Sequence, residues 1–263
     1  MKAKSIILSM FLAAIVMMMV VGCTKSDNNN SGSDDQETPK FGVFSPGKKI
    51  KKLTTYKEGS LKHHQLWNWN GDLLESIKEE YQAAEFSFSY DEFNRLIRVD
   101  VLYYDDRTDR EIGGFLLDYF EDGVAVLRNN GSPIPDTVMM YFCQNEKISK
   151  GIVDDYIFNY YWSDDNLIRD TRNGHDEKTY EYDNQHNPFC GFMPFYFYEG
   201  REAFGISGIW SKNNAILVKH NGNIYYKYNY EYDSDGYPTS YVISDPAANG
   251  YDYDGQIVEI EYW

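Results

Sequence analysis

The sequence predicts an all-β protein, an antiparallel meander of about nine repeated hairpins that curls into an open sheet or a barrel-like one. Polar and apolar residues alternate along many short segments, as Lys227 and Asn229 alternate with Tyr226, Tyr228 and Tyr230, so each segment has one apolar face. Turn residues separate the segments, and similar units return about every 21 residues, one hairpin per repeat. No long stretch shows the roughly 3.6-residue period of an amphipathic helix.

Residues 1–22 have the pattern of a secretory signal. Lys2 and Lys4 precede an apolar run over residues 6–21, which is shorter than the roughly 20 residues that a membrane-spanning helix needs. The segment runs into the letters "VVGC", whose cysteine is Cys23, and this ending resembles the bacterial lipobox. The resemblance implies cleavage before Cys23 and attachment of a diacylglyceryl group to its sulfur. An ordinary secretion signal with an incidental cysteine is the alternative.

Residues 23–40 comprise this cysteine and a predicted flexible tether, because residues 24–40 contain no aromatic and no large apolar side chain. Thr24 stands where an aspartate would indicate retention in the inner membrane of enteric bacteria. By that analogy we expect a protein that is lipid-anchored to the outer membrane, on its periplasmic or cell-surface face. The membrane is expected as a partner through the lipid anchor only.

Residues 41–263 are expected to form a single repeat-built β domain. The repeat count predicts roughly 16 to 18 strands. Within residues 72–86, Leu73, Ile77 and Tyr81 lie four residues apart, so a short helix is the alternative there. The repeated units cover residues 67–77, 86–101, 116–128, 138–149, 156–170, 178–189, 205–219, 227–243 and 249–263.

Two of these units, "YDEFNRLIRV" and "YEYDSDGYPTSYVI", are similar to the YD-type repeats of bacterial shell-forming proteins. Together with the lipobox and the segment "DNQHNPF", they make residues 48–263 resemble a Bacteroidetes lipoprotein family of unknown function with a porin-like fold. The resemblance implies an architecture and an envelope location. It supplies no catalytic residues.

The last strand favours a porin-like topology in a soluble protein rather than a membrane pore. Glu259 and Glu261 share a face with Trp263, and carboxylates facing lipid would cost up to a few kcal/mol each. The opposite face, with Val258 and Ile260, is apolar. We therefore expect the aromatic faces to turn inward and the ionic faces to meet water.

Residues 187–207 break the period and are rich in proline, glycine and aromatic residues. A closed barrel of about 16 strands encloses more room than its own side chains fill. The segment is therefore predicted to fold over one end or into the interior as a cap. A hairpin with a long loop is the alternative.

Composition and motifs exclude several classes of function. The formal net charge is −16, and such a surface repels nucleic acids and anionic lipids. The sequence has no phosphate-binding glycine loop, no GxSxG turn and no HExxH motif. The five histidines are scattered. No nucleic acid partner, no metal and no cofactor are expected.

A binding site for a glycan or protein would need tyrosine or tryptophan rings that face solvent. Trp67, Trp69 and Tyr225 are the candidates. Cys143 and Cys190 remain after lipidation of the first cysteine, in a compartment that permits disulfides. They either pair with each other or stay as two buried thiols.

The function predicted from these observations is a non-catalytic envelope lipoprotein, with a structural role or a glycan or protein ligand. The alternative is a glycan-degrading hydrolase that uses paired carboxylates. Glu259 and Glu261 are the pair that shares a face, at about 7 Å along a strand. That separation is compatible with an inverting glycosidase.

Overall fold

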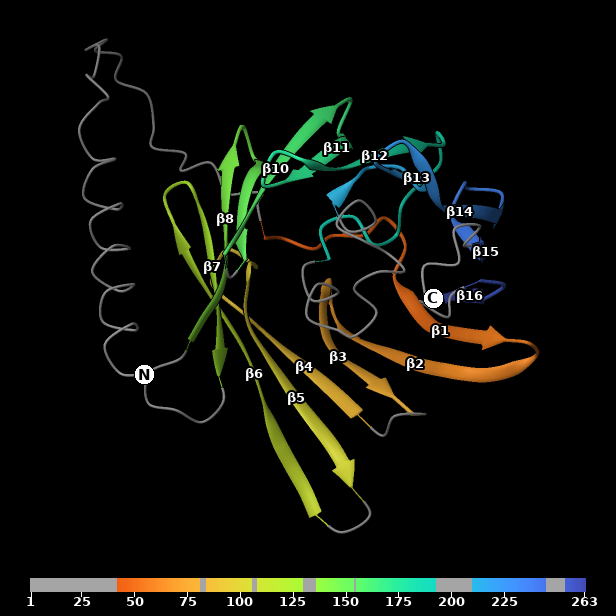
Figure 1. Cartoon of the computed structure of the whole chain (residues 1–263). Helices are drawn as coiled ribbons and strands as arrows, with labels where there is room; N and C mark the ends of the chain where they lie inside the picture. The colour runs from red at the N-terminus through yellow and green to blue at the C-terminus, as the bar shows by residue number, and fades with distance from the viewer. Residues whose placement is uncertain are drawn as a thin grey trace, which may run out of the picture. The chain divides into compact units, whose positions relative to one another are not determined.

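A computed structural model gives the fold of the chain (Figure 1). The chain divides into two units, Met1–Glu37 and Thr38–Trp263, and every residue described below belongs to the second. The predicted signal segment and nearly all of the tether belong to the first unit, and both lie outside the described residues. The structure describes residues 42–80, 84–105, 108–129, 136–153, 155–192, 210–244 and 254–263.

The described residues form sixteen antiparallel strands that close into a barrel, which confirms the predicted all-β meander (Figure 1). The last strand pairs with the first, from Ile50 opposite Tyr262 to Tyr56 opposite Ile257. No helix in the described ranges is long and apolar enough to cross a membrane. The strands are β1 (Ile50–Lys57), β2 (Ser60–Asn70), β3 (Leu73–Glu79), β4 (Ala84–Tyr90), β5 (Leu96–Asp105), β6 (Thr108–Phe120), β7 (Gly123–Asn129), β8 (Asp136–Gln144), β9 (Lys147–Val153), β10 (Tyr156–Ser163), β11 (Asn166–Arg172), β12 (Asp176–Tyr182), β13 (Ala215–His220), β14 (Asn223–Tyr232), β15 (Pro238–Ser244) and β16 (Ile257–Tyr262).

Because neighbouring strands run in opposite directions, the turns after even-numbered strands and those after odd-numbered strands lie at opposite ends of the barrel. The start of β1, the end of β16 and every turn that follows an even-numbered strand lie at one end, here called the anchor end. The turns that follow odd-numbered strands lie at the other, here called the far end. The short helix that was the alternative for residues 72–86 is wrong, because β3 occupies most of this segment.

Aromatic side chains near the ends of the even-numbered strands explain the tyrosine repeat. Each donates a hydrogen bond, from a phenol O–H or an indole N–H, to a backbone carbonyl at the start of the preceding odd-numbered strand, at 2.6–3.1 Å. A carbonyl at the rim of a sheet needs such a partner when it is screened from water. The donor and acceptor pairs are Trp69 and Ile50, Tyr90 and Leu74, Tyr119 and Leu96, Trp162 and Ile148, Tyr182 and Leu167, Tyr230 and Ala215, and Tyr262 and Pro238.

Strand β8 departs from this arrangement. Cys143 faces Ile148 across β8 and β9 just as Trp162 faces Leu167 across β10 and β11, and a bulge precedes each of the two residues. A thiol therefore occupies the position of the anchoring ring. Tyr141, the aromatic residue of this repeat in the sequence, lies two residues earlier and is buried in the core.

Two aspartates that directly follow even-numbered strands, Asp91 after β4 and Asp233 after β14, shape the turns, as turn chemistry predicts. Asp91 Oδ1 accepts hydrogen bonds from the backbone N–H groups two and four residues later, both at 2.9 Å. Asp233 Oδ1 does the same at 2.9 and 3.0 Å. Each turn then needs a left-handed residue, supplied by Asn94 with φ of 61° and Gly236 with φ of 81°.

The aromatic faces turn inward, as the alternation of side chains predicts. In β14, Tyr226 and Tyr228 are buried while Lys227 is exposed, and in β16 Val258 is buried while Glu259 is exposed. The buried residues of successive strands form one core cluster inside the barrel. Hydrophobic burial inside a ring of strands therefore holds the fold together.

The outer face is not ionic all round. On its outward positions, β6 carries Phe120 and β10 carries Ile157 and Tyr161, with exposed fractions of 40%, 42% and 40%. Leu116 faces Leu127 on the outer side of β6 and β7. The expectation of an ionic outer side holds for β14 and β16 but is wrong on this sector, because these outward positions carry apolar side chains.

The period breaks between Tyr182 and Trp210, as the sequence indicates. Strand β12 pairs directly with β13, and Tyr182 lies opposite Ala215, so residues 183–214 connect two neighbouring strands. This connection starts and ends at the anchor end.

The described start of the connection packs against the inner face of other strands. Phe189 and Phe192 are buried, and their ring centroids lie 6.3 and 5.0 Å from that of Trp67 in β2. Phe192 also lies 4.9 Å from Phe44, which precedes β1. Residues 187–192 therefore act as the predicted cap, and residues 193–207 of the same segment lie outside the described residues.

Candidate functional site

A row of ionisable side chains crosses the inner face of the barrel near the far end. Asp170 in β11 lies opposite Lys178 in β12, and Lys178 lies opposite His220 in β13. Direct cross-strand partners share one face of a sheet. Tyr180, two residues from Lys178, is buried in the core, so this face is the inner one.

Asp176 is the ionic centre of this region. It forms ion pairs with Arg172, its cross-strand partner in β11, and with His220. Nδ2 of Asn221 donates a third contact to it at 3.4 Å. The hydrogen bond from His220, with the charges of His220 and Arg172, lowers the pKa of the Asp176 carboxyl despite the opposing effect of burial. Asp176 is therefore an anion that holds the Arg172 guanidinium and the His220 imidazole in place.

Asp170 is the opposite case. Its side chain is 6% exposed and accepts a hydrogen bond from the Tyr180 hydroxyl. Burial raises the pKa of the Asp170 carboxyl, because the charged form loses its hydration. The hydrogen bond from Tyr180 and the charge of Lys178 oppose this rise without cancelling it.

A bulge brings an aromatic ring to the same region. The register shifts by one residue where β13 pairs with the start of β14, so Tyr225 has no partner of its own on β13. The Tyr225 ring packs against the core cluster, and the Lys178 ammonium lies 5.5 Å from its centroid. The His220 ring meets Tyr225 edge-on, also at 5.5 Å. We call Arg172, Asp176, Lys178, His220 and Tyr225 the far-end site.

The three aromatic candidates of the sequence therefore have different places. Tyr225 is half-buried within the far-end site. Trp67 is 1% exposed and belongs to the capped core, so the expectation that its ring faces solvent is wrong, because its strand position points inward. Trp69 is half-buried, and its indole N–H is engaged by the Ile50 carbonyl at 2.7 Å.

The cysteines offer no reactive group. Cys143 and Cys190 are free thiols. Burial raises the pKa of the Cys143 thiol to about 12 and that of the Cys190 thiol to about 11, so neither forms the reactive thiolate at neutral pH. Cys23, the predicted lipidation site, lies outside the described residues.

The carboxylate pair that the sequence suggests for a hydrolase lies outside the barrel. Glu259 and Glu261 are on the outer face, and Glu261 forms an ion pair with Lys52. The pair that lies inside the barrel is Asp170 and Asp176. Alternation within residues 176–182 would have placed Asp176 on the face of Tyr180. In β11 a bulge separates the buried Leu167 from the buried Asp170, so local alternation does not show that Asp170 points inward, and only the strand register shows that the two carboxylates are neighbours.

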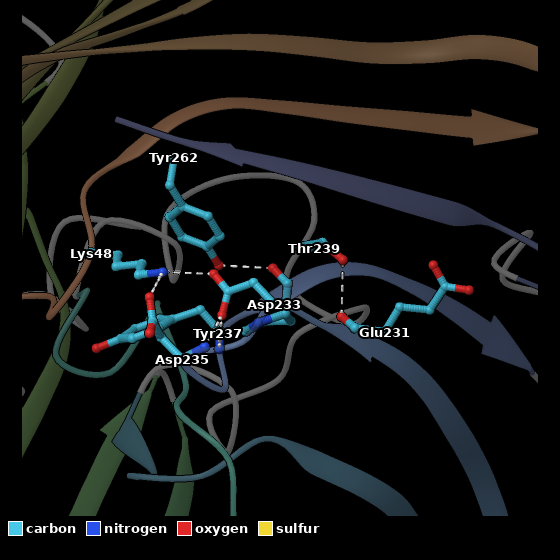
Figure 2. A network of polar contacts seen from close by, with 8 residues as sticks. Lys48, Glu231, Asp233, Asp235, Tyr237, Thr239 and Tyr262 are labelled. Carbon is cyan, nitrogen blue, oxygen red and sulfur yellow. Dashed lines mark hydrogen bonds and ion pairs between the residues drawn. The ribbon is translucent and has the colours of Figure 1, made fainter.

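The turn "DSDG" anchors the start of the barrel and leaves no room for a cation. Lys48, just before β1, donates to Asp233 Oδ2 at 2.7 Å and to Asp235 Oδ2 at 2.6 Å (Figure 2). The hydrogen bond from Lys48 lowers the pKa of the Asp233 carboxyl. The Lys48 ammonium thus engages both carboxylates of this turn. Among the residues that the structure describes, no group of three or more His, Cys, Asp or Glu side chains could hold a metal ion.

Comparison with known proteins shows likeness in structure only. No family model and no curated protein sequence matches the chain. A porin-like protein from Bacteroides vulgatus is 10% identical with a TM-score of 0.42, over 82% of this chain and 99% of that one. A porin-like protein from Bacteroides uniformis is 12% identical with a TM-score of 0.40, over 81% of this chain and 98% of that one.

Proposed function

We propose that this chain is a lipid-anchored protein of the bacterial outer membrane that binds a glycan or a protein without catalysing a reaction. The lipobox-like segment ending in Cys23 supports the anchor, and residues 24–40 would serve as the tether. The observation that carries the binding role is the far-end site, where a half-buried tyrosine ring lies among charged groups on the inner face.

The two ends of the barrel differ in the side chains that they carry, and this difference supports a binding site at the far end. The anchor end is filled by rings such as those of Trp67 and Phe192, and its charged groups Lys48 and Asp233 engage each other. The far end carries ionisable side chains that are partly exposed, with Arg172 46% and His220 34% accessible. Concave sites with a few fixed polar groups beside aromatic rings are typical of ligand binding.

A hydrolase remains the second candidate because of Asp170 and Asp176. They are diagonal neighbours on one face, which places their side chains about 7–8 Å apart, within the range of inverting glycosidases. Their pKa values shift in opposite directions, as acid and base pairs require. However, Tyr180 engages the first carboxyl, and Arg172 and His220 engage the second, which favours binding over proton transfer.

The anchor is tested by labelling growing cells with a palmitate analogue. The wild-type chain is expected to incorporate the label and to fractionate with membranes. Cys23→Ser removes the acceptor thiol, so we expect complete loss of label and release of the chain from membranes. Label that persists in this variant, or a wild-type chain that never takes it up, would refute the proposed anchor.

The binding role is tested with the purified full chain in detergent micelles, against arrays of glycans and of envelope proteins. A ligand should be retained without product, and Tyr225→Ala should weaken its binding about tenfold, as expected for one aromatic contact. Tyr161→Ala is the matched control, since this ring also packs under a cation, with Arg169 3.9 Å away, but on the outer face. Product release that Asp170→Asn abolishes would establish the hydrolase instead.

A further inference from the structure

Lys178 is a cation that faces the barrel interior. In the ranges that the structure describes, no ion pair joins Lys178 to a carboxylate, although Asp170 lies opposite it. The chain as a whole carries a net charge of −16, so a lysine that points inward without an ion pair among the described residues is a candidate for binding an anionic ligand.

A second cation lies over a second ring nearby. The Arg172 guanidinium lies 5.2 Å from the centroid of Tyr156, which begins β10 and is 46% exposed. Phe158, two residues later on the same face, lies opposite Arg172 and stacks on Tyr160 in the core. Tyr156 therefore lies at the inner rim of the far end, as Tyr225 does.

Two asparagines hold this rim in a fixed shape. Asn173 Oδ1 accepts from the Ile157 N–H at 2.9 Å, and the Asn173 N–H donates to the Ile157 carbonyl at 2.7 Å. Asn221 makes the same pair of bonds with Glu177, at 3.0 and 2.8 Å. Each asparagine lies just after the end of its strand and continues the hydrogen bonding to the neighbouring strand. Rings and cations on such a rim are ordered before a ligand arrives, which lowers the entropic cost of binding.

We infer that the ligand of the far-end site is an acidic saccharide. Its anionic groups, carboxylate or sulfate, would pair with Lys178 and Arg172, and its sugar rings would stack on Tyr225 and Tyr156. A cation beside an aromatic face provides both contacts that a charged sugar needs, an ion pair and an apolar platform. This inference rests on the proposed function, since it names the ligand class of the same site.

The experiment measures the affinity of the full chain, in detergent micelles, for three oligosaccharides of equal length that are neutral, uronate-containing or sulfated. We expect at least one acidic saccharide to bind about tenfold more tightly than the neutral one, with a preference that weakens as salt is added. Lys178→Gln should reduce the preference to about twofold. Lys227→Gln, at an exposed outward position on β14, should leave it unchanged.

The outcomes separate this inference from the proposed function. Equal binding of neutral and acidic saccharides, or a preference that survives Lys178→Gln, overturns the inference and leaves the binding role intact. Binding to no glycan and no protein overturns both. Arg172→Gln is the second variant, and its thermal unfolding is compared with that of the wild type, because loss of its ion pair with Asp176 could alter the fold. The uronate and sulfate arms identify which acidic group is recognised.

Discussion

Phe192→Ala is expected to lower the free energy of unfolding by about 3–5 kcal/mol, the usual cost of deleting a buried phenylalanine ring. Phe192 is 2% exposed, and its ring lies 4.9 Å from Phe44, 5.0 Å from Trp67 and 6.2 Å from Phe88 between centroids. These three rings come from three separate parts of the chain. Removing the central ring leaves a cavity that a closed barrel cannot collapse easily, because its strands are fixed by their neighbours.

Denaturant unfolding of the full chain measures this effect. Phe120→Ala is the matched control, since Phe120 is 40% exposed on the outer face, and it should cost much less. A loss below about 1 kcal/mol for Phe192→Ala would show that residues 187–192 do not serve as a cap.

The strand pattern could be predicted because the residues within each hairpin determine its inward face and its turn. Alternation within β14 and β16 identifies the inward face without knowledge of the partner strands. Asp91 and Asp233 shape their turns through bonds to residues two and four positions later. Strand alternation and these side-chain to backbone hydrogen bonds involve residues only a few positions apart, so a short sequence window is enough to predict them.

The departures from the repeat depend on longer-range pairing. Strand β8 has Cys143 where β10 has Trp162, with a bulge before each of the two, so Tyr141 lies two residues before the rim position, and nothing in the local alternation shows this. The long connection after Tyr182 joins two neighbouring strands, and the break in the period gives no sign of that pairing. Bulges and long connections are set by how the whole ring closes, so a single repeat cannot reveal them.

The far-end site was predictable only in part for the same reason. Tyr225 was expected as a binding residue from its aromatic character alone. Lys178 and His220 come together because β12 pairs with β13 across the long connection, and Tyr225 joins them through a bulge. Burial of Asp170 is likewise a result of the closed interior and has no signature in its own neighbourhood. Charged residues that share an inward face with buried tyrosines were the one available clue.

Tyr180→Phe is expected to destabilise the chain more at neutral pH than in acid. The Tyr180 hydroxyl is the hydrogen-bond donor to the buried Asp170 carboxyl. Burial holds the pKa of that carboxyl above its ordinary value, and the hydroxyl opposes this rise. A group whose pKa is raised on folding lowers stability as the pH increases, because the unfolded chain ionises first. Loss of the hydroxyl raises this pKa further and so enlarges the penalty at neutral pH.

We expect a loss of about 1.5–3 kcal/mol near neutral pH, where the bond serves an ionised group, and about 1 kcal/mol where the carboxyl is protonated. Denaturant unfolding at about pH 7.5 and about pH 3.5 brackets this change and avoids the sequence pI of about 4.7. In an Asp170→Asn background the amide oxygen still accepts the bond but cannot ionise. There, Tyr180→Phe should cost the same at both pH values, about 1 kcal/mol. An equal cost at both pH values in the wild-type background would mean that Asp170 does not ionise within the barrel over this range. A larger cost in acid would mean that the Tyr180 hydroxyl raises the pKa of Asp170 instead of lowering it.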